Sequence, residues 1–556
     1  MLPSRESEVR AASGPGLLPL WHRVLRGMMR RVNRLMLLAT ILAAVSLTAA
    51  RQNPPARFQI EEATIPQIHA ALKSGTLTCR ALVEQYLARI EAFDKRGPRL
   101  NAIVVVNPRA LDEADGKDKA LKQGEMTGAL FCIPTIVKDN FETVGLQTAA
   151  GSLALEGFSS TKDAFQVRRI KDAGAIVLAK SNMAEWAFSP YETVGSILPG
   201  YTRNPYALDR VTVGSSGGTA AAVAASLGAI GLGSDTGNSI RGPSSHQALA
   251  GIRSTMGLTS RGGVVPLNLL ADIAGPMTRT LADAVTVLQV IAGPDPDDLV
   301  TVAHTPIAQA FSPAGRPATV PNYAAAMRGD GLKGKRVGIL RQAYERDTTD
   351  PEIVKVFMTA VDGLRRAGAV IVDPVRVDLD QVRRPQGAGT CGGFKYDINR
   401  WLAGHADRVP VKDLAGIIQS RRFHPSVQRR LEQSQEGTEN GPDSDACKAE
   451  AEYRARVRTA VLSTMDADKL DGFVYPTWSN PPRLIGDLNT PHGDNSQFFA
   501  PTTGFPAINV PMGYTRDGAL PAGMTFFGRP WDEAGLIALA YGYEQSTHHR
   551  RPPKLH

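Results

Sequence analysis

Val213-Gly-Ser-Ser-Gly-Gly-Thr219 and Gly233-Ser-Asp-Thr-Gly-Asn-Ser-Ile-Arg-Gly-Pro243 are two glycine-rich stretches that carry serines and lie close together in the chain. Between them we expect a helix over 220–226 and a short apolar strand over 229–232. Glycine is used where the backbone takes a positive φ or approaches a ligand closely. Two such turns can place a hydroxyl and several free N–H groups around one point. That arrangement suits acyl transfer to a serine.

A third stretch lies upstream, Ile133-Pro-Thr-Ile-Val-Lys-Asp-Asn140, in which an apolar run of β type ends at a lysine. Together the three stretches resemble the amidase signature family, whose serine hydrolases use a Ser–cis-Ser–Lys triad. The resemblance extends over residues 63–552, with the three motifs in the order that the family has. It implies an α/β fold, an α/β/α sandwich around a large mixed β-sheet.

The resemblance assigns three catalytic roles. Ser239 attacks the carbonyl and carries the acyl group, Ser215 relays protons from within a cis peptide, and Lys138 is the base. Each residue also has a purely structural interpretation. Ser239 could be a helix N-cap, Ser215 and Ser216 could belong to a serine-glycine loop, and Lys138 could be a surface lysine at the end of a strand.

A lysine must be neutral to act as a base, and burial disfavours the charged amine. The apolar run 131–137 before Lys138 would provide that burial. Asp139 argues the other way, because an adjacent carboxylate favours the ammonium. We therefore expect Asp139 to point away from the amine, into backbone hydrogen bonds.

The oxyanion hole is expected from the backbone N–H groups of Thr236, Gly237, Asn238 and Ser239. Asn238 departs from the family pattern, which has glycine there. Asparagine tolerates a positive φ, so the loop can form. Its side chain is expected to narrow or polarise the substrate pocket.

Other polar and aromatic residues near the motifs could have a structural or a functional role. Asp235 and Arg241 are expected to brace the loop. Histidines could suggest a Ser–His mechanism or a metal, and the candidates are His246, His492, His548 and His549. None of them has a partner at ligand spacing. We therefore expect no metal and no cofactor. Aromatic residues could line an acyl pocket or simply pack, namely Trp186, Phe188, Tyr191 and those of 478–499.

Outside the motifs, strands alternating with helices favour a sheet covered on both faces. Strands are expected at 102–106, 131–137, 175–179, 337–341, 472–477, 507–511 and 524–528, and helices at 65–72, 78–90, 110–123, 163–173, 247–251, 282–292, 351–367 and 533–545. Residues 377–470 are mostly helical and charged. The span 377–500 is a candidate insertion that covers the substrate.

The N-terminal segment 1–50 has the layout of a secretory signal: a basic region to Arg34, an apolar core over 35–45 and small residues at 48–50. The apolar run is short for a bilayer span. We expect export to the periplasm or the medium, then a linker over 51–62. An uncleaved membrane anchor is the alternative.

The net charge of +9 is not concentrated on the domain, because basic residues precede it over 23–34 and others lie at the far end over 549–554, so no nucleic-acid partner is expected. The four cysteines show no metal-ligand spacing. Cys132 is predicted to be a buried thiol, and Cys391 with Cys447 is the pair that we would test as a disulfide.

These features favour an exported amidase that hydrolyses linear carboxylic amides, with carbamates and esters as further substrates. The expected partner is the small-molecule amide, and a homodimer is left open. Two alternatives remain: the A-type subunit of an amidotransferase, which would be cytosolic, and a catalytically inactive scaffold of the same family.

Overall fold

The computed structural model describes residues 27–29, 31–32, 36, 58–384, 390–491 and 493–555. The chain divides into Met1–Phe58 and Gln59–His556. Nearly all of the expected signal, and most of the linker, lie outside the described residues. No helix in the described part of the chain is long and apolar enough to cross a membrane.

Gln59–His556 is built on one mixed sheet of eleven strands, in the order β1-β3-β2-β6-β8-β7-β12-β13-β11-β9-β10. The strands are β1 Ile103–Val106, β2 Pro134–Lys138, β3 Ile176–Ser181, β6 Ile230–Asp235, β7 Ala250–Arg253, β8 Ile273–Thr278, β9 Arg336–Leu340, β10 Val370–Val375, β11 Gly472–Pro476, β12 Ala507–Thr515 and β13 Leu520–Phe527. A separate hairpin joins β4 (Arg203–Asn204) to β5 (Ala207–Val211). The predicted α/β/α sandwich with a large mixed sheet is confirmed.

Strands β2, β3 and β6 form the part of the sheet that positions the catalytic motifs. All three are fully buried, and β2 pairs in parallel with both β3 and β6. Parallel strands covered on both faces are expected to be continuously apolar, which is what their sequences largely show. Their carboxyl ends lie at one edge of the sheet, where the loops that follow them meet.

Most of the predicted helices are present, with ends within a few residues of the prediction. They are α2 Ile65–Lys73, α3 Cys79–Ile90, α4 Ala110–Lys122, α5 Phe165–Asp172, α6 Gly217–Ala224, α8 Leu281–Ile291, α10 Pro351–Arg366 and α16 Glu533–Thr547. The hydroxyl of Thr78 accepts from the N–H of Ala81 at the start of α3. Thr78 is thus the N-cap of this helix.

The predicted helix over 247–251 is wrong. The helix in this region is α7 (Arg241–His246), which ends before residue 247. Residues 250–253 form β7, an inner strand between β8 and β12. A short apolar run is compatible with a buried helix or a buried strand, so periodicity alone could not decide.

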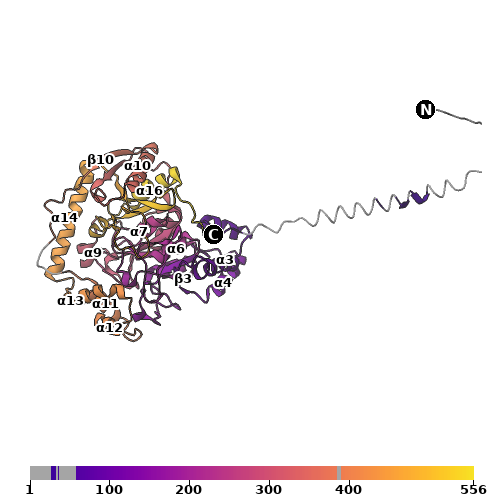
Figure 1. Cartoon of the computed structure of the whole chain (residues 1–556), viewed down its shortest axis with the longest axis horizontal. Coiled ribbons are helices and arrows are strands. Elements are labelled where there is room, and N and C mark those ends of the chain that lie inside the picture. Colours follow the sequence, from indigo (N-terminus) through magenta and orange to yellow (C-terminus); the bar gives the residue numbers. More distant parts are fainter. Residues whose placement is uncertain are drawn as a thin grey trace, which may run out of the picture. The chain divides into compact units, whose positions relative to one another are not determined.

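Residues 377–470 contain α11 Phe394–Ala403, α12 Leu414–Ser420, α13 Gln428–Glu436 and α14 Asp445–Ala467, the long helix along one side of Figure 1. The stretch 294–317 contains a short helix, α9 (Pro306–Phe311). Helices α11 to α13 contribute Phe394, Leu414 and Leu431 to the hydrophobic cluster that also contains Trp186 and Phe188.

Two disulfides are present. Cys391 and Cys447 are bonded, as the sequence suggests. The prediction that Cys132 is a free buried thiol is wrong, because it is bonded to Cys79, with 5.8 Å between their Cα atoms. Cys79 begins α3 and Cys132 precedes β2, so the bond joins two segments that are far apart in the sequence. Among the described residues no group of histidine, cysteine and carboxylate side chains could hold a metal ion.

Candidate active site

Lys138 is the last residue of β2, and its side chain is completely buried. Its Nζ lies 2.7 Å from Ser215 Oγ and 2.8 Å from Ser234 Oγ. Burial lowers the pKa of Lys138 to about 7, although the carboxylates of Asp272 and Asp235 oppose the shift. At neutral pH a large share of the molecules therefore carry a neutral amine, which is the form that accepts a proton.

Ser215 lies in the turn before α6, and the peptide bond between Gly214 and Ser215 is cis. A Cβ at position 214 would lie 2.4 Å from Ser189 O and 2.5 Å from Glu192 O, so this turn requires glycine. The neighbouring hydroxyl of Ser216 donates to Ser234 O at 3.1 Å. Ser216 thus ties the turn to the end of β6.

Ser239 lies between β6 and α7 and is 5% exposed. Its hydroxyl donates to Asn238 Oδ1 at 3.4 Å. Within the described part of the chain no hydrogen bond joins it to Ser215. The structure therefore brings Lys138 and Ser215 into direct contact and leaves Ser239 in the adjoining loop.

Asn238 connects the two serine loops. Its Nδ2 donates to Gly214 O at 3.2 Å and to Pro190 O at 3.3 Å. The residue is 2% exposed, and its backbone does not adopt a positive φ. Glycine is therefore not required here, and the side chain is engaged with backbone carbonyls. Sequence reasoning missed this connection.

The loop of the predicted oxyanion hole offers unused donors. In the described part of the chain, no protein acceptor takes the N–H groups of Thr236, Gly237, Asn238 or Ser239. The Thr236 hydroxyl donates to Asp272 Oδ1 at 2.5 Å. Free N–H groups beside a serine are what an oxyanion hole needs.

Asp235 and Arg241 brace this loop, as predicted. Arg241 Nε lies 3.1 Å from Asp235 Oδ2, and its Nη2 donates to Gly237 O at 2.6 Å. Arg253, on β7, approaches the same carboxylate at 3.0 Å. Burial would raise the pKa of Asp235, but these two guanidinium groups hold it at about 2.

Asp139 points away from the lysine amine, as predicted. Its Oδ2 accepts from the N–H of Gly151 at 3.0 Å, and its Oδ1 lies 3.8 Å from Lys180 Nζ. Lys180, on β3, is a second fully buried lysine that sequence reasoning did not single out. Its position in a buried apolar strand was a signal that could have found it.

A family model described as amidase matches residues 81–537 of the chain. The chain belongs to the amidase signature family. It is therefore an enzyme that hydrolyses C–N amide bonds, and its fold and motifs are those that the sequence resemblance implies.

Two relatives of this amidase cover nearly all of it. A probable amidase of Arabidopsis thaliana is 33% identical over 521 residues, which are 90% of this chain and 92% of that protein. The A-type subunit of the glutamyl-tRNA(Gln) amidotransferase of Acinetobacter baumannii (strain AYE) is also 33% identical, over 87% of this chain and 96% of that protein.

Solved structures of peptide amidase are similar to this amidase. The complex with the competitive inhibitor chymostatin has a TM-score of 0.76 at 35% identity and covers 89% of this chain and all of that one. The native enzyme from Stenotrophomonas maltophilia has a TM-score of 0.75 at 33% identity, over 90% of this chain and all of that one.

Of the candidate histidines, the three that lie in the described part of the chain, His246, His548 and His549, have no hydrogen bond to a serine hydroxyl. The ring of His246 contacts Asn480 O at 3.3 Å, and burial lowers its pKa to about 3. His548 is the C-cap of α16, and the ring of His549 lies against Tyr543. His492 lies outside the described residues.

Two of the aromatic residues proposed for the pocket, Trp186 and Phe188, pack against Phe394 of α11. The ring of Phe188 lies 4.6 Å from that of Phe394, and the ring of Trp186 lies 5.9 Å from it. Trp478 packs on His246, with 5.3 Å between the ring centroids. Packing is thus the observed role of these side chains.

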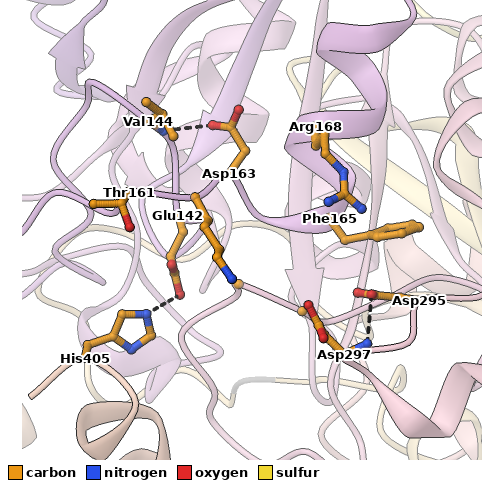
Figure 2. A pocket seen from close by; sticks show the side chains of 12 residues that line it. Glu142, Val144, Thr161, Asp163, Phe165, Arg168, Asp295, Asp297 and His405 are labelled. Carbon is orange, nitrogen blue, oxygen red and sulfur yellow. Dashed lines mark hydrogen bonds and ion pairs between the residues drawn. The ribbon is translucent and has the colours of Figure 1, made fainter.

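A cavity of about 520 Å³ lies to one side of the loop that follows β2. Figure 2 shows Glu142 and His405 facing one another at its edge, with 3.2 Å between Oε1 and Nε2. Its other charged residues include Asp163, Arg168 and Asp297. None of the predicted catalytic residues lines it, so it is separate from the candidate active site.

Proposed function

We propose that this protein is an exported amidase that hydrolyses linear carboxylic amides through an acyl-enzyme on Ser239. Ser239 Oγ attacks the amide carbon while its proton passes to Ser215, and the Ser215 proton passes to the neutral amine of Lys138. The N–H groups of residues 236–239 stabilise the oxyanion that forms.

The tetrahedral intermediate then loses the amine. Lys138 returns its proton through Ser215 to the leaving nitrogen, the C–N bond breaks, and the acyl group stays on Ser239. A water molecule attacks this ester by the same proton path, which releases the acid and restores the serine.

The contact between Lys138 and Ser215 is the observation that carries the proposal. A buried amine with a pKa of about 7 lies 2.7 Å from a serine hydroxyl. The ideal pKa of a general base lies near the working pH, and burial provides that value here. The free N–H groups next to Ser239 supply the second requirement of acyl transfer.

The likeness to peptide amidase suggests which amides to test. We propose that C-terminally amidated peptides are substrates along with simple alkyl and aryl amides. Carbamates and activated esters share the acyl-enzyme path and are expected as side substrates.

Labelling with a fluorophosphonate probe, followed by a panel of amides, tests the proposal. Such probes react with an activated serine, so the wild-type protein should be labelled and Ser239→Ala should not. Absence of labelling in folded wild-type protein would favour an inactive scaffold.

The likeness to the A-type subunit of an amidotransferase favours a second candidate function. In that case the purified protein alone would be poorly active on the amide panel, and hydrolysis of glutamine would depend on added partner proteins. Robust hydrolysis of simple amides by the isolated chain excludes this candidate.

The two disulfides support export, because disulfides persist in oxidising compartments and are rare in the cytosol. The basic, apolar and small-residue layout of 1–50 supports it independently. Membrane attachment through an uncleaved segment is the alternative.

A further inference from the structure

The pairing of β2 with β3 places two buried lysines on opposite faces of the sheet. In the parallel register, Lys138 lies opposite Ser181 and Val137 lies opposite Lys180. Side chains alternate between the faces along a strand. The Ser181 hydroxyl contacts Thr219, in α6, at 2.7 Å, so Ser181 and Lys138 share the face on which Ser215 lies. Lys180 projects to the other face.

Asp139 follows the same alternation. It comes directly after Lys138, and its N–H still bonds to Ser181 O at 3.1 Å, as in a continued strand. Its side chain therefore projects to the face of Lys180. Asp139 is the next residue after the base, but the sheet separates their side chains.

Lys180 is held by several acceptors on its face. Its Nζ donates to Phe141 O at 2.7 Å, and to Gln147 O and Thr148 Oγ1 at 3.1 Å. Asp139 Oδ1 lies 3.8 Å away and has no hydrogen-bond partner among the described residues. The ammonium is thus the group that balances this buried carboxylate.

We propose that Lys180 is a positioning residue for the catalytic base: its ammonium holds and neutralises the Asp139 carboxylate on the far face of the sheet, so that this carboxylate does not favour the charged form of Lys138. This inference rests on the proposed function of Lys138. Lys180 acts through Asp139 and touches no reacting atom.

Other charged groups also lie around the two lysines, and most of them are paired. Asp235, one of the carboxylates that act on Lys138, is paired with Arg241 and Arg253; Asp272, the other, accepts from the Thr236 hydroxyl. On the other face, the carboxylates of Asp139 and Glu142 favour the ammonium form of Lys180. Lys171 and Asp163 have weaker effects on it, and these two residues pair with each other at 2.8 Å. Glu142 is paired with His405.

Burial raises the pKa of Asp139 and lowers that of Lys180, and the charge of each residue opposes the shift of the other. Removal of Lys180 raises the pKa of Asp139 further above its value of about 6, and wherever Asp139 is still ionised its negative charge on the far face of the sheet is left uncompensated. An opposite charge favours the ammonium form of a lysine. The acid side of the pH profile should therefore move to higher pH.

The experiment measures kcat/KM against pH for Lys180→Met, Asp139→Asn and the double variant, with a non-ionising acyl 4-nitroanilide as substrate. We expect the acid-side midpoint to rise by about one pH unit in Lys180→Met and to return close to the wild-type value in the double variant. Asp139→Asn, which leaves the cation alone, should lower the midpoint. Lys171→Met, which removes a cation from an ion pair further out, is the matched control and should leave it unchanged.

Thermal unfolding establishes which variants are folded. A folded Lys180→Met with the wild-type midpoint overturns the inference, as does a double variant that keeps the shifted midpoint. If Lys180→Met does not fold, Asp139→Asn decides: an unchanged midpoint overturns the inference. Failure of the proposed function is a separate result, since it would appear as an active Lys138→Ala enzyme.

Discussion

Asn238 Nδ2 donates to Gly214 O at 3.2 Å, and this hydrogen bond links the loop of Ser239 to the turn of Ser215. The same amide also donates to Pro190 O and accepts the Ser239 hydroxyl. Two loops that are separate in the sequence are thus held together by one side chain. The relative position of the two serines, which the proposed proton relay requires, depends on this link.

We expect Asn238→Gly to slow hydrolysis by roughly tenfold, because it removes hydrogen bonds that each contribute about 1 kcal/mol. The ranking of amides by acyl chain should stay the same, since the side chain faces backbone carbonyls. Steady-state kinetics on the amide panel checks both points. A changed ranking at an unchanged rate would place the side chain against the substrate instead, as the sequence predicted.

The pH dependence of kcat/KM follows from the lowered pKa of Lys138. The neutral amine is the base, so activity should be low below about pH 6 and rise through a midpoint of about 7. A pH profile measured with a non-ionising substrate checks this. A midpoint of about pH 4, where carboxyl groups titrate, would contradict a lysine base.

The bond between Cys79 and Cys132 should stabilise the fold. Cys79→Ser is expected to lower the free energy of unfolding by about 2–4 kcal/mol, because the bond closes a long loop in the unfolded chain. Urea unfolding of the variant and of the oxidised wild type measures the difference. Mass spectrometry that finds a free thiol at Cys132 in native protein would contradict the pairing.

The N-terminal segment should be removed on export. We expect the mature protein to begin near Arg51, after the small residues at 48–50. N-terminal sequencing of protein from the periplasm or the medium tests this. Recovery of the intact chain from the membrane fraction would support an anchor.

Local motifs explain why much of the site could be predicted. Lys138, Ser215 and Ser239 lie in short stretches whose residue types and order are specific, and the strand before Lys138 is apolar over most of its length. Burial of the lysine followed from that run alone. Asp139 could be expected to turn away because the alternative would have opposed the chemistry.

Contacts between distant segments could not be predicted in this way. Lys180 is matched to Asp139 by the register of β2 and β3, and Asn238 reaches Gly214 because two loops meet at the sheet edge. Cys79 and Cys132 are 53 residues apart in sequence. Each of these pairs depends on tertiary packing, and neither composition nor periodicity carries that information.

The most direct test of the account compares hydrolysis by Lys138→Ala, Ser239→Ala and the double variant. Removal of a general base typically costs about 10²–10⁴-fold in rate, and loss of the nucleophile should abolish both labelling and turnover. Because the residues act as one unit, the losses should be far from additive, and the double variant should be scarcely worse than Ser239→Ala. Near wild-type hydrolysis by Lys138→Ala, together with a dead histidine variant, would contradict the account.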